Sequence, residues 1–325
     1  MSSRHRLRNY SPVFPDRGAA NIAAAYAAYN EAGGDYAAYA DGDPTRLYDF
    51  DGLHGYADRQ VWALLEAKLS ALRATGSRSI SILDAGCGPG TWLRRLVTRA
   101  YTLGFTSITA RGFDIAKAQI QRAQLLARDL EKLSGVDLTF EVAHLAGRLP
   151  EAGGSVDITL CLYSVLSHLP VESLPNISSE IARVTSVHFI TTVRAAGSTP
   201  TILIDSIKKA RHFSHDNSRD KYEIALYDGR HMIFDFHLFT AAELQNYFAD
   251  DFEVEDLRGL DLFHNRFAPD SRWNPASLTA DVQFCNELER LEENLCQKIR
   301  FHGTGDPFPA GGAPPRNRDL EMSWK

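Results

Sequence analysis

The chain has 325 residues, of which 44% are apolar and 23% charged, and a formal net charge of −6. This composition is that of a globular protein with one large domain and additions, or two small domains. The acidic balance argues against nucleic acid as a main partner, and no apolar run approaches the roughly 18 residues that would span a membrane.

The cysteines and the N-terminus indicate a cytoplasmic protein. None of the four cysteines lies in a Cys-x-x-Cys pair, so the sequence predicts neither a zinc site nor a redox motif. Residues 1–8 are basic but no apolar segment follows them, so we expect no secretory signal and no membrane partner.

Residues 1–55 are predicted to form an aromatic-rich N-terminal cap. Ile22, Tyr26 and Tyr29 recur at helical spacing. Further aromatic residues follow in a stretch rich in glycine and aspartate, at Tyr36, Tyr39, Tyr48, Phe50 and Tyr56. Such a segment either closes over an active site or packs on the core of the next domain, and the sequence favours neither alternative.

A strand, a glycine loop and a helix follow one another around residues 80–100. Ile80–Leu83 is apolar and β-branched, which predicts a buried strand. Gly86, Gly88 and Gly90 then allow the backbone to turn sharply and to approach a ligand closely. The helix after the loop directs its N-terminal N–H groups at whatever lies over the loop. The pattern predicts a nucleotide-cofactor site.

The spacing of the glycines narrows the choice of cofactor. A dinucleotide fingerprint requires Gly-x-Gly-x-x-Gly, but Thr91 occupies the place of the third glycine. The next predicted strand, 109–113, ends in Asp114, where an acid commonly binds ribose. Asp84-x-Gly-x-Gly-x-Gly followed by this acid resembles motif I and its successor in class I S-adenosylmethionine-dependent methyltransferases. The alternative is a glycine-rich turn of some other α/β protein.

Strands and helices alternate after the loop, which predicts an α/β fold with a doubly wound sheet. The resemblance implies a Rossmann-like sheet of seven strands, mostly parallel, with the last strand antiparallel. The domain is predicted to span 56–325. The elements expected within it are helices over 61–72, 116–130, 177–184 and 240–248, and strands over 136–143, 156–162, 187–193, 252–257 and 320–324.

Two insertions are predicted in this domain. Residues 195–239 carry a basic run over 208–221 and then two alternating segments around Asp228-Gly229, which predict a β-hairpin. Residues 264–318 contain a helix over 288–299 and a Gly/Pro-rich loop. We expect the first insertion to be a second part of the cap; the alternative is that its hairpin packs on the helical layer or forms a dimer contact.

The resemblance also implies which residues bind S-adenosylmethionine. The glycine loop and Asp84 would hold the methionine end, Asp114 would accept from ribose hydroxyls, and Ile115 would pack on adenine. Family members usually place an aspartate near the adenine amino group, but this chain has Leu145, preceded by His144. The expected cofactor-binding residues are Asp84, Gly86, Cys87, Gly88, Gly90, Asp114, Ile115, His144, Leu145 and Leu162.

The segment 156–170 resembles motif IV of small-molecule methyltransferases, with Ser167-His168 where the family often has two histidines or Asn-His. Methyl transfer requires an in-line approach that positioning can largely supply, and only a neutral hydroxyl or a carbon acid calls for a base. His168 and Tyr163 are the candidate catalytic residues. For each, the alternative is an ordinary packing role.

These observations predict an enzyme that methylates a small molecule, in a specialised biosynthetic pathway, at a nitrogen, oxygen or carbon atom. One alternative is a methyltransferase acting on RNA or protein, favoured by the basic run 208–221. Another is a cofactor-binding protein without catalysis. No metal is expected, and a homodimer is left open.

Overall fold

The computed structural model describes the central part of the chain, as residues 47–48, 50, 55–196, 210–216, 220–227, 229, 231–261, 266–268 and 270–275. The helix expected near 22–29, the helix expected over 288–299 and the strand expected over 320–324 lie outside the described residues. The described residues also leave out the turn at Asp228 and most of the second insertion.

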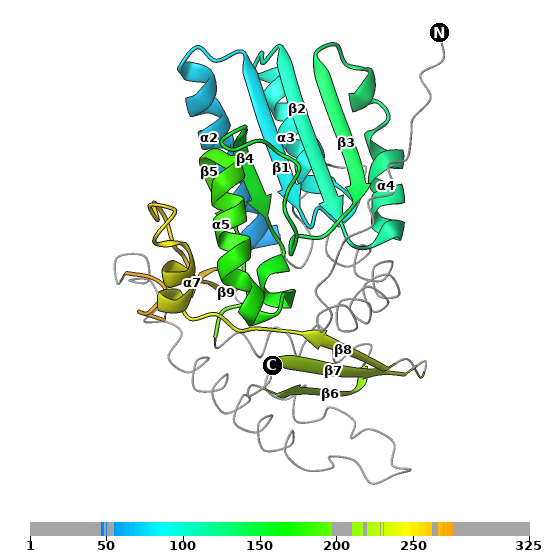
Figure 1. Cartoon of the computed structure of the whole chain (residues 1–325), viewed down its shortest axis with the longest axis vertical. Coiled ribbons are helices and arrows are strands. Elements are labelled where there is room, and N and C mark those ends of the chain that lie inside the picture. Colours follow the sequence, from blue (N-terminus) through cyan, green and yellow to red (C-terminus); the bar gives the residue numbers. More distant parts are fainter. Residues whose placement is uncertain are drawn as a thin grey trace, which may run out of the picture.

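A parallel sheet of five strands lies at the centre (Figure 1). Its order is β3-β2-β1-β4-β5, and every neighbouring pair is parallel. The order reverses beside β1, and open α/β sheets bind ligands outside the carboxyl ends of the strands at such a point. The strands are β1 (Ser79–Ala85), β2 (Ser107–Asp114), β3 (Val136–Val142), β4 (Val156–Cys161) and β5 (Thr185–Thr191).

Helices cover both faces of this sheet. One face packs against α2 (Gly55–Ala74), α3 (Thr91–Thr102) and α4 (Lys117–Ala127). The other packs against α5 (Leu174–Val184) and α7 (Ala241–Phe248). The short helices are η1 (Leu130–Lys132), η2 (Val165–His168) and η3 (Val171–Ser173). The predicted doubly wound α/β fold is confirmed for this sheet.

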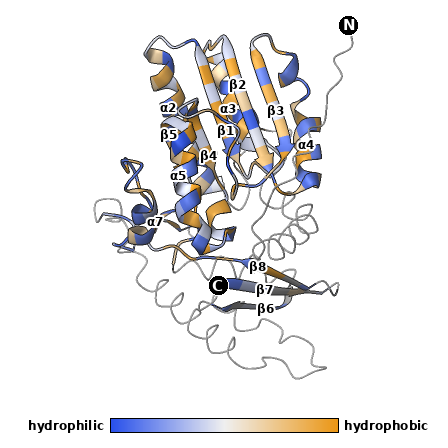
Figure 2. Cartoon of the chain, in the orientation of Figure 1, coloured by the Kyte–Doolittle hydropathy of each residue, from blue (hydrophilic) through white to orange (hydrophobic). Residues whose placement is uncertain are grey.

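Apolar periodicity along the strands shows which faces are covered. In β1, Ile82 belongs to the core on the α3 side and Leu83 to the core on the α5 side, as expected of a strand buried on both faces. The edge strand β3 alternates instead, as Figure 2 shows, with Leu138 buried and Thr139 exposed. The reason is that residues 143–155, between β3 and β4, form no helix that would cover its second face.

The described residues do not confirm a seven-stranded sheet. The predicted sixth strand, 252–257, is irregular. Phe252 packs on β5 and α7 instead, since its ring lies 5.5 Å from that of Phe189 and 6.0 Å from that of Phe248. The fifth strand begins at Thr185, two residues before the predicted start.

The first insertion forms a second, antiparallel sheet of β6 (Ala210–Asp216), β7 (Lys221–Leu226) and β8 (His231–Asp235). The predicted hairpin corresponds to β7 and β8, whereas β6 was not predicted. The three-stranded sheet lies beyond the carboxyl ends of the central strands (Figure 1). A small hairpin of β9 (Leu260–Asp261) and β10 (Arg266–Phe267) follows α7.

The two ends of this insertion are joined to each other. Ala195 and Phe239 form a parallel bridge. The N–H of Phe239 donates to the carbonyl of Arg194 over 2.9 Å, and the N–H of Ala196 donates to the carbonyl of Phe239 over 2.6 Å. We call residues 194–196 and 237–239 the neck of the insertion.

Among the helices that the structure describes, none combines the length and apolar character needed to cross a bilayer. The cytoplasmic location, the domain boundaries and the homodimer stay predictions.

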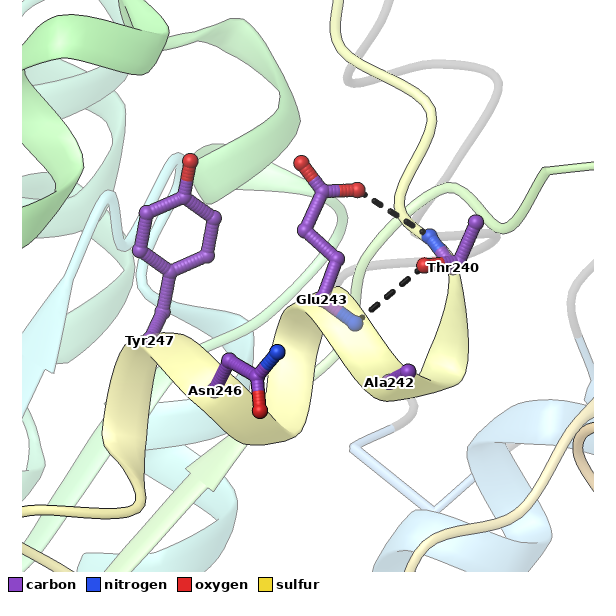
Figure 3. Close-up of a pocket in the computed structure, with 5 residues that line it drawn as sticks. All are labelled: Thr240, Ala242, Glu243, Asn246 and Tyr247. Atoms are coloured by element: carbon purple, nitrogen blue, oxygen red, sulfur yellow. Dashed lines mark hydrogen bonds between the residues drawn. The ribbon is translucent and has the colours of Figure 1, made fainter.

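The start of α7 confirms the predicted capping box (Figure 3). The hydroxyl of Thr240 accepts from the N–H of Glu243 over 3.2 Å, and the Glu243 carboxylate accepts from the N–H of Thr240 over 3.4 Å. Two N–H groups that the first helical turn leaves without helix partners are thereby satisfied.

Thr240→Ala should lower the free energy of unfolding by about 1 kcal/mol, because it removes the side-chain acceptor of the cap. Thr102→Ala is the matched control, since its exposed hydroxyl only donates to the carbonyl of Thr98 at the far end of α3. Urea unfolding of both variants measures the difference. Equal stability of the two variants would show that the cap contributes nothing.

Candidate functional site

The glycine loop after β1 is tied to the end of β2. The N–H groups of Gly86 and Cys87 both donate to the carbonyl of Phe113, over 2.8 and 2.9 Å. The next residues are held by the Asp114 carboxylate, which accepts from the N–H of Gly88 over 2.9 Å and from that of Ala116 over 2.8 Å. The end of β2 therefore determines where the loop lies.

Two glycines of the loop meet different surroundings. A Cβ on Gly86 would lie 2.4 Å from the side chain of Val165, so glycine permits close packing between the loop and the segment after β4. A Cβ on Gly88 would meet no atom within 4 Å, and its φ is +51°. The loop therefore presents backbone to open space at Gly88, where a ligand can approach it. Gly90 is the N-cap of α3.

Three ionisable groups surround the loop. Asp84 is buried at the end of β1. Burial raises the pKa of the Asp114 carboxyl, while the N–H groups of Ala116, Gly88 and Ile115 act in the opposite direction. Burial, together with the charges of Asp84 and Asp114, raises the pKa of the Cys87 thiol well above its usual range. Cys87 is therefore a neutral thiol and not a nucleophile.

The residues after β3 differ in exposure. Leu145 is buried in the core on the α5 side. His144 is partly buried, which lowers its pKa, and its Nδ1 accepts from the N–H of Ala146 over 3.1 Å. In the neutral ring Nε2 then carries the proton, so this nitrogen can donate to a ligand but cannot accept from one.

Two consecutive residues after β4 have left-handed backbone conformations, with φ of +54° at Tyr163 and +67° at Ser164. Such conformations cost about 1–3 kcal/mol each in non-glycine residues and cluster at functional sites. Leu162, just before them, is buried in the core on the α3 side. The ring of Tyr163 lies against α3, with its centroid 6.4 Å from that of Trp92.

The hydroxyl of Tyr163 donates to the carboxylate of Asp58, at 2.9 Å from Oδ1 and 2.8 Å from Oδ2. Asp58 lies in the first turn of α2 and is only 8% exposed. The sequence did not predict Asp58 as a site residue. The available signal was a carboxylate at a helix start, which is common on protein surfaces and does not indicate a site.

His168 ends η2 and touches the three-stranded sheet. Its Nδ1 lies 3.2 Å from the carbonyl oxygen of Asp235, and its ring centroid lies 5.1 Å from that of Phe236. Because a carbonyl only accepts, Nδ1 is the donor. Burial lowers the pKa of His168 to about 4. The ring is therefore neutral at pH 7, and Nε2 has the basic lone pair.

Two surface hollows lie away from the glycine loop. One, of about 450 Å³, runs along α7 beside Glu243 and Tyr247 (Figure 3). The other, of about 390 Å³, lies on the polar face of β1–β3 beside Arg111. Neither has a lining residue from the glycine loop, so the candidate site rests on the loop, Asp114 and the segment after β4.

Comparisons with known proteins identify this arrangement. Residues 82–187, from β1 into β5, match the family model of a methyltransferase domain. The chain contains a methyltransferase domain. This confirms the prediction of a class I methyltransferase, an enzyme that uses S-adenosylmethionine. No curated protein matches the sequence.

Solved structures with a similar fold include a protein of Pyrococcus horikoshii OT3, which is 17% identical, with 70% of this chain and 93% of that chain covered and a TM-score of 0.45. Magnesium protoporphyrin IX methyltransferase from Synechocystis PCC 6803 is 21% identical, with 71% and 87% covered and a TM-score of 0.43. A methyltransferase from Clostridium acetobutylicum ATCC 824 is 12% identical, with 72% and 92% covered and a TM-score of 0.44.

Two structural observations indicate that the methyltransferase domain can hold its cofactor. The space over Gly88 admits a ligand to the backbone. The Asp114 carboxylate is fixed by backbone N–H groups, and a carboxylate has about four lone-pair sites in all. The Asp114 carboxylate can therefore hold the loop and still accept a hydrogen bond from a ligand.

His168→Asn tests whether this histidine is buried and neutral. The unfolded chain takes up a proton on His168 below its ordinary pKa of 6.5, whereas the folded chain does so only near 4. Folding stability from this group is therefore lost as the pH falls from about 6.5 toward 4. Asn keeps a donor for the Asp235 carbonyl without titrating.

Urea unfolding at pH 7 and pH 5 should show that the His168→Asn variant loses less stability on acidification than the wild type. Equal losses would mean that His168 titrates normally in the folded protein.

Proposed function

We propose that the protein transfers a methyl group from S-adenosylmethionine to a small molecule enclosed between the central sheet and the first insertion. The observation that carries this proposal is the attachment of the three-stranded sheet to the segment after β4. The N–H of His237 donates to the carbonyl of Ser167 over 2.7 Å. Together with the contact of His168 to Asp235, it supports a cap over the carboxyl ends of the strands.

The cap sheet is also attached to α7. Nδ1 of His237 lies 3.0 Å from Asp220, at the start of β7, and Nε2 lies 2.8 Å from Glu243, in the first turn of α7. The His237 ring therefore links the cap to the helical layer. A cap held on two sides favours a substrate small enough to be enclosed.

A second part of the enclosure comes from the N-terminal segment. The buried guanidinium of Arg95 lies 4.7 Å from the ring centroids of both Phe50 and Trp92 and donates to the carbonyl of Leu47. The hydroxyl of Tyr48 donates to the Arg95 carbonyl over 3.3 Å. These contacts hold Leu47, Tyr48 and Phe50 on α3, next to the glycine loop, and support the N-terminal segment as a cap.

Within this proposal the cofactor-binding residues keep their predicted roles. Bound S-adenosylmethionine would supply an electrophilic methyl group. Asp84 and the glycine loop would hold its methionine end, and Asp114 would accept from the ribose hydroxyls. Ile115 and Leu145 would pack on adenine, and Nε2 of His144 would donate to a ring nitrogen.

His168 is a weak candidate for a general base. A pKa of about 4 makes its lone pair weakly basic. Its Nε2 is better suited to accept a hydrogen bond than to remove a proton from a neutral hydroxyl. The acceptor from a specialised biosynthetic pathway stays a prediction.

A macromolecular acceptor is the second candidate, because of the basic run 208–221. Acidic groups weaken that argument: Lys221 forms an ion pair with Asp235, and Asp216 and Asp220 lie in or beside the run. The net charge of −6 opposes binding to RNA.

The proposal is tested by incubating the protein with cofactor labelled on its methyl group and separate small-molecule, RNA and protein fractions. Label should move to the small-molecule fraction, and calorimetry should show binding of S-adenosylmethionine but not of NAD. Transfer only to RNA or protein would favour the second candidate. Cofactor binding without transfer to any fraction would favour a non-catalytic protein.

Asp114→Ala should weaken binding of S-adenosylhomocysteine by about 2 kcal/mol or more, because a hydrogen bond to a charged group contributes roughly 1.5–3 kcal/mol. It should also lower stability, because the N–H groups of Gly88 and Ala116 lose their acceptor. Asp137→Ala, on the exposed face of β3, is the matched control. Calorimetry and urea unfolding measure both effects, and an unchanged dissociation constant in a folded variant would contradict the ribose role.

A further inference from the structure

The pair of Asp58 and Tyr163 joins two distant segments at the candidate site. The residues lie 105 positions apart in the sequence, on α2 and directly after β4. Both carboxylate oxygens of Asp58 lie within 2.9 Å of the Tyr163 hydroxyl. A single hydroxyl proton is thus shared between two acceptor oxygens.

This geometry determines what the Tyr163 oxygen can do toward a third group. An ionised carboxylate only accepts, so the hydroxyl proton points at Asp58. The Tyr163 hydroxyl is the donor to both oxygens of this carboxylate. Toward any further partner, the Tyr163 oxygen can therefore only accept a hydrogen bond.

Tyr163 lies beside the loop that holds the methyl donor. Its ring contacts Trp92, the second residue of α3 after Gly90. Two residues later, Val165 packs where a side chain on Gly86 would stand. The left-handed conformations of Tyr163 and Ser164 produce this placement, and strain of this kind is characteristic of active sites.

We propose that the Tyr163 oxygen accepts a hydrogen bond from the nucleophile of the methyl acceptor, and that Asp58 is the positioning residue that orients the Tyr163 hydroxyl. This inference rests on the proposed function. It selects an amine as the acceptor over a carbon nucleophile. The nitrogen–carbon bond would form as the carbon–sulfur bond of the bound cofactor breaks, and the product would keep the amine proton as an ammonium group, so no base is needed. Accepting from the N–H of the amine leaves the lone pair of the nucleophile directed at the methyl carbon.

The competing explanation is that the pair only ties α2 to the end of β4. If the pair is only a structural tie, removing it should change the affinities for all cofactor analogues by the same factor. A hydrogen-bond acceptor beside the transferable methyl group would distinguish analogues that differ at that position.

Sinefungin and S-adenosylhomocysteine provide this distinction, because sinefungin has an amine where the cofactor has its transferable methyl group and S-adenosylhomocysteine has nothing there. Calorimetry on the full chain should show that Tyr163→Phe lowers the affinity for sinefungin by about tenfold or more. This is the loss expected for one hydrogen bond to a charged group. The affinity for S-adenosylhomocysteine should not change. Phe keeps the ring that packs on Trp92.

Asp58→Asn should also lower the affinity for sinefungin but not for S-adenosylhomocysteine. The Asn amide keeps an oxygen that can accept from Tyr163, but its NH₂ group can also donate to the Tyr163 oxygen and turn the hydroxyl proton toward the ligand. Tyr101→Phe and Asp129→Asn are matched controls on exposed positions and should leave both affinities unchanged. Thermal unfolding checks that each variant is folded.

An equal loss of affinity for both ligands, or an unchanged affinity for sinefungin, would overturn the proposal. Asp58 and Tyr163 would then only hold α2 against the end of β4. A wild-type protein that binds neither ligand would overturn the proposed function itself, and this is apparent before any variant is made.

Discussion

One carbonyl group, that of Phe113, organises the candidate site. It accepts from two consecutive N–H groups of the glycine loop, and the next residue, Asp114, holds Gly88. The loop after β1 is thus built on the end of β2, so neither strand forms the site alone. Parallel pairing of the two strands in full register, from Ser79–Ser107 to Ala85–Phe113, is what brings these groups together. The start of α3 follows from the loop, because Gly90 is the N-cap of this helix.

Much of this arrangement could be predicted from the sequence because the signals are local. The strand, the glycines and the start of α3 are contiguous, and Asp114 follows at a spacing that one helix and one strand require. The capping box of α7 was predicted for the same reason, since Thr240 and Glu243 are three residues apart. A periodicity within one segment is enough for such features.

Other features depend on contacts between distant segments, and these could not be predicted. Residues 252–257 alternate as a strand would, but they are irregular, and Phe252 packs its ring on Phe189 of β5 and Phe248 of α7. The basic run concealed β6, because its sequence lacks clear alternation. Asp58 and Tyr163 lie 105 positions apart in the sequence, so no local pattern connects them. The left-handed backbone at Tyr163 and Ser164 could not be predicted either, because neither residue is a glycine or an asparagine, which adopt this conformation more readily.

The neck of the first insertion has a consequence for how this protein could change. Its bonds, from Phe239 to Arg194 and from Ala196 to Phe239, involve main-chain atoms alone. Their strength does not depend on which side chains the sheet β6–β8 has. The chain enters and leaves the insertion through adjacent residues, so a replacement segment that begins and ends there can keep these main-chain bonds. Under the proposed function, exchanging the sheet β6–β8 would change the wall around the methyl acceptor while the glycine loop stays the same.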